Sequence, residues 1–188
     1  VVALGVLAFI YRKQIKGVAT KGLKKSKSKL SSFKQGVVDK ANSEWKRFGE
    51  PTRDTNGKWI KTGAKENDEG FWQRVGDYWK QGTGYKYTGK DRDVPWSSAF
   101  ISWVMKSTDP NKRFVYSSSH SKYIRDSIKN RKENKLNEPF VGYKIEEKPV
   151  EVGDLVCYSR QGGVGYDTTS SYKSHCDLVV SKNEATKE

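Results

Sequence analysis

Cysteine, histidine and methionine are scarce in this chain of 188 residues, which has two Cys, two His and one Met. Two Cys in a chain of this length do not form the disulfide framework of a small secreted protein. The Cys and His residues also lack the CxxC or HxxxH spacing that lets two side chains face one ion. The Gly-rich stretch 161–165 lacks the Lys-Ser/Thr pair of a phosphate-binding loop. We therefore expect neither a bound metal nor any other cofactor.

Acidic residues are absent from Val1 to Val38, a segment that has nine Lys or Arg. Removing this +9 from the net charge of +14 leaves +5 for the remaining 150 residues. Because most of the excess charge lies in one terminal arm, the composition does not indicate a basic surface on the folded part. We expect no nucleic-acid partner.

The sequence has no apolar run as long as the roughly 20 residues of a membrane-spanning helix. The opening run, residues 1–10, is either the end of a transmembrane helix, a signal-like segment, or a helix that packs on the domain or on a partner. The basic stretch 21–35 is either a solvated linker or a surface for anionic lipid or wall polymer. We assign residues 1–36 to an arm and 37–188 to a domain.

Aromatic residues are abundant, with six Trp, ten Tyr and seven Phe, and they supply enough apolar area for a core. Apolar side chains recur at helical spacing first, and β-rich segments follow. The domain is therefore predicted to be α+β, with helices packed on a small antiparallel sheet. The predicted helices are 37–49, 71–81, 95–107 and 120–134, and the predicted strands are 140–145, 152–160 and 174–182. A Gly-rich loop at 161–173 joins the last two strands.

The positions of a serine pair, a histidine and an aspartate in the predicted helices and strands favour nucleophilic catalysis. Ser97 and Ser98 open a predicted helix, where the helix dipole and free backbone N–H groups stabilise negative charge. His175 opens a predicted strand and is a candidate base. Asp177 leaves the same face of that strand two residues later, where it would orient His175 or contact substrate. An ordinary helix N-cap and a hydrogen-bonded strand-end His are the structural alternatives.

The two Cys are weaker candidates, although a thiolate is a better nucleophile than an alkoxide. Cys157 and Cys176 both lie in predicted strands, where alternate residues face the core. We expect both to be small buried apolar residues with unpaired thiols.

Four motifs, taken together, resemble one enzyme superfamily. The segment 96–100, Trp-Ser-Ser-Ala-Phe, resembles the Trp-Cys-Ala-Ala-Phe helix start of NlpC-type and CHAP amidase-peptidases, which are papain-like bacterial enzymes that cut peptidoglycan stem peptides. The segments 152–156 and 174–180 resemble their Gly-Asp-Leu strand and their His strand. An uncharacterised bacterial branch, with Trp-Ser in place of Trp-Cys and a segment like 117–124, is more similar still. The similarity spans about residues 41–181.

The resemblance implies a papain-like fold, with Ser97 at the nucleophile position and His175 at the base position. A hydroxyl is harder to deprotonate than a thiol, so Ser demands a better-placed base. The third polar residue of these enzymes usually follows the His strand. Here it is Asp177, or a residue beyond Glu188, or absent. The residues expected to line the cleft are Trp96, His120, Tyr123 and Arg160, with Arg160 available to pair with a stem-peptide carboxylate.

The function implied is that of a peptidoglycan hydrolase, an amidase or endopeptidase. Its expected location is the bacterial envelope or periplasm, reached by secretion or by delivery into a target cell as a toxin domain. Peptidoglycan is the expected partner, with a cognate immunity protein if it is a toxin and a membrane surface if the arm binds one. Two alternatives are a non-catalytic wall-binding module on the same fold and a membrane-tethered polyanion-binding protein.

Overall fold

The computed structural model describes residues 30–182 except 55 and 112. The expectations for the apolar and basic arm before residue 30 therefore lie outside the described residues. Within the described part of the chain, every helix is too short or too polar to cross a membrane.

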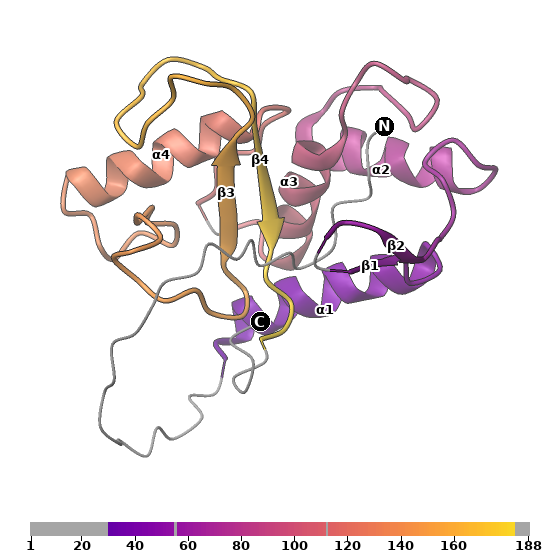
Figure 1. Cartoon of the computed structure of the whole chain (residues 1–188), viewed down its shortest axis with the longest axis horizontal. Coiled ribbons are helices and arrows are strands. Elements are labelled where there is room, and N and C mark those ends of the chain that lie inside the picture. The colour runs from indigo at the N-terminus through magenta and orange to yellow at the C-terminus, as the bar shows by residue number, and fades with distance from the viewer. Residues whose placement is uncertain (1–29, 55, 112, 183–188) are drawn as a thin grey trace.

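The described chain is α+β, with four helices and two antiparallel sheets of two strands each (Figure 1). The first sheet pairs β1 with β2, and the second pairs β3 with β4. The bounds are α1 Ser32–Arg47, β1 Thr52–Arg53, β2 Trp59–Lys61, α2 Phe71–Thr83, α3 Ser97–Thr108, α4 His120–Lys132, β3 Leu155–Ser159 and β4 Ser174–Leu178.

All four predicted helices are confirmed, with shifted ends. Helix α1 begins at Ser32 rather than Val37, because the Ser31 hydroxyl accepts a hydrogen bond from the backbone N–H of Lys34 and caps the helix. Residues 32–36, which the predicted arm includes, thus form the start of α1. Helix α3 begins after Pro95, with Trp96 at the N-cap.

The strand predicted at 140–145 is wrong, because this segment is irregular. Its backbone bonds to a helix instead of a strand: the Gly142 N–H donates to the Ser127 carbonyl of α4 at 2.8 Å. A side chain at Gly142 would meet Ser127 and Ile128 within 3.0 Å, so only Gly permits this close approach. The ring of Phe140 packs into the core against Phe114.

Helix α3 lies at the centre of the fold, in contact with α1, α2 and β4. Every residue from Ser98 to Met105 is buried. Gly82 lets α2 approach closely, since a Cβ there would lie 2.6 Å from the Ala99 carbonyl oxygen. Aromatic rings fill the space between α2 and α3, with the Tyr78 ring 5.0 Å from those of Phe100 and Trp103.

A buried ion pair joins α1 to α2. The guanidinium of Arg74 donates to both carboxylate oxygens of Glu44, at 2.8 and 2.7 Å, and the Tyr78 hydroxyl donates to the same carboxylate at 2.5 Å. Burial opposes ionisation of Glu44, but the hydrogen bonds from Arg74 and Tyr78 keep its pKa below the ordinary value. Arg74 is therefore the main partner of the carboxylate, and the exposed Arg47, at 3.4 Å from Oε2, is a weaker second cation.

We expect Arg74→Ala to lower the free energy of unfolding by about 3 kcal/mol at pH 7, because it leaves a buried carboxylate with only the longer contact to the exposed Arg47. Since the folded pKa of Glu44 is depressed, its contribution is present at neutral pH and is lost as pH falls. The difference from wild type should therefore shrink below about pH 4. Urea denaturation at several pH values measures this. Lys61→Ala, which removes an exposed pair with Glu50, is the control and should leave the free energy of unfolding almost unchanged. An equal loss in both variants would contradict the role given to the buried pair.

Candidate active site

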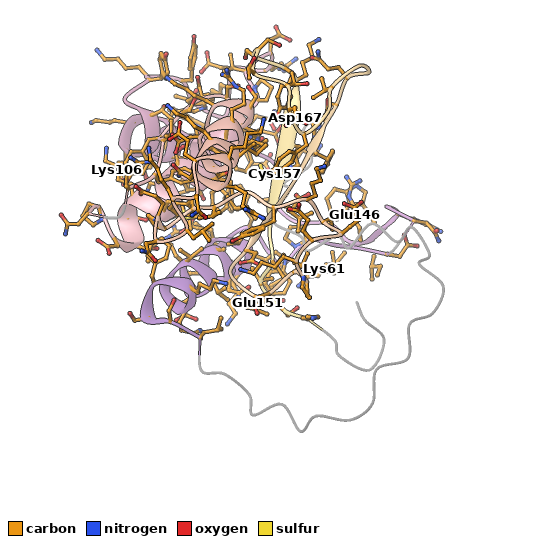
Figure 2. The ribbon with its side chains drawn as sticks, turned by 90° about the vertical axis from the view of Figure 1, so that its left-hand side faces the viewer. Lys61, Lys106, Glu146, Glu151, Cys157 and Asp167 are labelled. Atoms are coloured by element: carbon orange, nitrogen blue, oxygen red, sulfur yellow. A yellow bond between two sulfur atoms is a disulfide. The ribbon has the colours of Figure 1, made fainter. Side chains whose placement is uncertain are left out.

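The β3–β4 hairpin carries two of the predicted site residues. His175 and Asp177 lie on β4, opposite Tyr158 and Val156 of β3. The hairpin stands beside α3, with the 161–173 loop at the end near α4 (Figure 1). In Figure 2, Cys157 lies along the hairpin between Asp167 of this loop and Glu151, which lies beside α1.

Cys157 and Cys176 form a disulfide, so the expectation of unpaired thiols is wrong. The two residues are partners in the β3–β4 register, which brings their side chains together on one face of the sheet. Sequence alone did not reveal this pairing because it depends on strand register. Cys176 is buried, as predicted, and lies between His175 and Asp177 along the chain.

Ser97 is the first residue of α3 and lies beside β4. Its Oγ is 3.5 Å from Nδ1 of His175, although the two residues are 78 positions apart in sequence. The other ring nitrogen of His175, Nε2, is 3.1 Å from Oδ1 of Asp177. The three residues predicted to act together therefore form a continuous chain of hydrogen-bonding contacts, and Asp177 orients the imidazole from the same strand.

A second imidazole contacts the same hydroxyl. Nε2 of His120, the first residue of α4, is 2.8 Å from Ser97 Oγ, and Nδ1 of His120 contacts the hydroxyl of Tyr123. The rings of His120 and His175 are 4.9 Å apart. Burial is the largest cause that lowers the pKa of His120 to about 3, followed by repulsion from His175 when that ring is protonated and from Arg160. His120 is therefore neutral at physiological pH.

Hydrogen bonds from α3 hold the segment that leads to His120. Ser98 and Ser102 both donate to the Ser117 carbonyl, at 2.7 and 3.1 Å, and the Ser117 N–H donates back to Ser102. Ser98 is only 1% exposed and faces this segment rather than the histidines. Of the two candidate nucleophiles, Ser97 alone therefore contacts the imidazoles.

Access to the site is narrow. His175 is 5% exposed and His120 is 6% exposed, whereas Ser97 is half-buried. The side chain of Asp177 is 13% exposed. The solvent-exposed surface of the site therefore belongs to Ser97 and Asp177 more than to either ring.

The residues predicted to line a cleft have different environments. Trp96 is 4% exposed and packs against Tyr78 and Phe48. It also borders a cavity of about 410 Å³ whose other walls include Trp59, residues 62–67 and Val94. Tyr123 is buried, and burial raises the pKa of its hydroxyl. Arg160 is exposed at the end of β3. A larger cavity, of about 450 Å³, lies between α4, residues 139–150 and β3.

The sequence predicts His120 and Tyr123 only as cleft-wall residues, and it does not predict that His120 contacts Ser97 or that Tyr123 contacts His120. Their i,i+3 spacing at the start of a helix puts both side chains on one face, which was the available signal. The spacing does not show where that helix face lies relative to α3. In the described part of the chain, His, Cys, Asp and Glu form no group of three or more that could hold a metal ion.

The fold and the site define an α+β domain that holds one serine between two histidines. The chain belongs to a bacterial family described as "Uncharacterized protein conserved in bacteria (DUF2272)", whose model matches residues 66–188. All the site residues lie in the matched part, whereas α1, β1 and β2 precede it. No protein with a curated description and no solved structure matches this chain.

Replacing both Cys157 and Cys176 with Ala should lower the free energy of unfolding by roughly 3 kcal/mol, because the disulfide closes a loop between residues 19 positions apart. Thermal melting of the variant, and of the wild type with and without dithiothreitol, measures this loss. Reduced wild type should melt near the variant, and dithiothreitol should leave the variant unchanged. Equal melting temperatures for oxidised and reduced wild type would contradict a stabilising disulfide.

Proposed function

We propose that the chain is a peptidoglycan hydrolase, an amidase or endopeptidase that uses Ser97 as its nucleophile. One observation carries the proposal: Ser97 Oγ lies 3.5 Å from His175 Nδ1, and Asp177 lies 3.1 Å from the opposite nitrogen of the same ring. The nucleophile, the base and the orienting carboxylate thus contact one another in that order, as acyl transfer by a hydroxyl requires.

The direction of proton transfer follows from these contacts. An ionised carboxylate only accepts hydrogen bonds, so Asp177 favours a proton on Nε2 of His175 and leaves the Nδ1 lone pair facing Ser97. As Ser97 Oγ bonds to the amide carbon, its proton moves to Nδ1. The imidazolium then protonates the leaving amine as the C–N bond breaks. Water hydrolyses the acyl-enzyme by the same steps, which returns the proton to Ser97.

The start of α3 supplies stabilisation for the oxyanion. The first N–H groups of a helix have no partner within the helix, and they lie at the positive end of its dipole. Ser97 is the first residue of α3, so a carbonyl attacked by its Oγ is next to these donors. Removing one such donor in other enzymes costs roughly 10²–10³ in rate.

The substrate class rests on the motif resemblance. A nucleophile at a helix start and a base on an antiparallel strand form the arrangement of papain-like NlpC and CHAP enzymes. The proposed site differs from that of these enzymes in two ways. Ser97 replaces their Cys, and Asp177, on the same strand as the His, replaces the third polar residue that they usually have on the next strand. Arg160, exposed at the end of β3, is available to pair with a stem-peptide carboxylate.

The disulfide supports an envelope location. Disulfides persist in oxidising compartments such as the bacterial periplasm and are rare in the cytosol. The pairing of Cys157 with Cys176 therefore favours the periplasm, or delivery into it as a toxin domain with a cognate immunity protein.

One observation favours a second candidate function, a non-catalytic wall-binding module on the same fold. His175 and His120 are almost fully buried, which suits a hydrogen-bonded structural cluster as well as a reaction centre. Such a module would bind peptidoglycan without cutting it.

Purified protein incubated with peptidoglycan should release muropeptides or new free amines. Ser97→Ala and His175→Ala should each lower this rate on the order of 10⁴-fold or more, because each removes a member of the proton-transfer chain. Ser107→Ala, at the other end of α3, is the matched control and should retain wild-type activity. Chromatography of the products and titration of free amines measure the rates.

A pull-down with insoluble peptidoglycan separates the two functions. Binding without release of products, unaffected by Ser97→Ala, would establish the binding module and overturn the hydrolase. Release that persists in Ser97→Ala would place the reaction elsewhere in the molecule.

A further inference from the structure

Two imidazoles contact Ser97, and the proton transfer described above uses only that of His175. The other belongs to His120. Ser97 Oγ lies 2.8 Å from His120 Nε2 and 3.5 Å from His175 Nδ1. A serine hydroxyl has one hydrogen to donate and lone pairs to accept with. It therefore donates to one histidine, and the other histidine must donate to it.

The carboxylate of Asp177 decides which histidine accepts. Its contact with His175 Nε2 requires the proton on that nitrogen, so the neutral ring presents a lone pair at Nδ1. Ser97 then donates to His175. His120 is left to donate from Nε2, and its Nδ1 accepts from the Tyr123 hydroxyl. Each group in the chain thus donates to the next, in one direction, from Tyr123 to Asp177.

Building on the proposed function, we propose that His120 is a catalytic hydrogen-bond donor to Ser97 Oγ and that Tyr123 is the positioning residue that fixes its Nε2–H tautomer. The proton of Ser97 moves to His175 during attack, while the N–H of His120 stays in place. This N–H holds the Ser97 rotamer and stabilises the negative charge that develops on Oγ. It thereby compensates for the weaker acidity of a hydroxyl relative to a thiol.

The surroundings of His120 suit a ring that stays uncharged. It is buried, and it faces Ser97 of α3, His175 of β4 and Arg160 beyond β3. During acylation His175 becomes an imidazolium whose ring is 4.9 Å away, so a charged His120 would oppose the reaction. The pKa of His120, about 3, keeps the ring neutral. The buried Tyr123 hydroxyl, with its raised pKa, remains a donor.

The opposite assignment, with His120 as the base, requires a different arrangement of protons. If His120 were the base, Ser97 would donate to it, and His175 would have to carry a proton on both nitrogens. Replacing His120 with Gln separates the two assignments, because an amide N–H₂ donates a hydrogen bond but does not take up the proton.

Under the proposal, His120→Gln retains activity within about tenfold of wild type, whereas His120→Leu loses on the order of 10²–10³-fold. Tyr123→Phe loses roughly tenfold, because it removes the donor that fixes the tautomer. His175→Gln loses on the order of 10⁴-fold or more. The acid limb of the pH–rate profile should stay in place in His120→Gln, since His175 remains the base. Melting temperatures check that each variant is folded.

Nitrogen-15 NMR tests the tautomer without an activity assay. The chain has only two His, so comparison of the wild-type ¹⁵N-histidine spectrum with that of His175→Gln identifies the wild-type signals of His120. His120 should appear as the neutral Nε2–H tautomer from pH 8 down to about pH 4, and Tyr123→Phe should lose this single tautomer.

The outcomes are distinct. A His120 protonated on Nδ1, or charged at pH 6, overturns the inference, as does a His120→Gln variant as inactive as His175→Gln. If wild type does not cleave peptidoglycan while NMR finds the predicted tautomer, the hydrogen-bond assignment stands and the hydrolase fails.

Discussion

The burial of α3 fixes the position of Ser97, and the site depends on this constraint. The helix is enclosed by α1, α2 and β4, and its residues from Ser98 to Met105 have almost no contact with solvent. Protein interiors are close-packed, so a helix held on several sides has little freedom to slide or turn. Its first residue is therefore presented at a defined place. Gly82 contributes by letting the backbone of α2 approach α3 closely.

The same helix also positions His120. Two buried serines of α3 bind the Ser117 carbonyl, which directs the chain into α4 with His120 as its first residue. The β3–β4 hairpin brings His175 to the other side of Ser97, and the disulfide joins the two strands at the neighbouring position. Ser97 thus meets two imidazoles that come from separate elements. Under the proposed mechanism the two rings have different roles: His175 takes up the proton of Ser97, and His120 stays neutral.

The sequence predicted the helices well because their apolar and aromatic residues recur at a strong helical period. It failed at 140–145, where the apolar residues serve packing and the backbone bonds to α4. The very short strands β1 and β2 were also not predicted, since two or three residues carry no periodicity. The site is predicted in part: the sequence groups Ser97, His175 and Asp177, which the structure brings into contact, whereas it predicts His120 and Tyr123 only as residues of a cleft wall.

The sequence by itself determined that His175 and Asp177 share one strand face, because side chains alternate with a period of two, and that Ser97 opens a helix. Tertiary structure decided that Ser97 meets His175 across 78 positions and His120 across 23. It also placed Ser97, and not Ser98, in contact with the two histidines, and it paired Cys157 with Cys176. These outcomes depend on helix packing and strand register, which arise from contacts between distant segments and leave no local pattern in the chain.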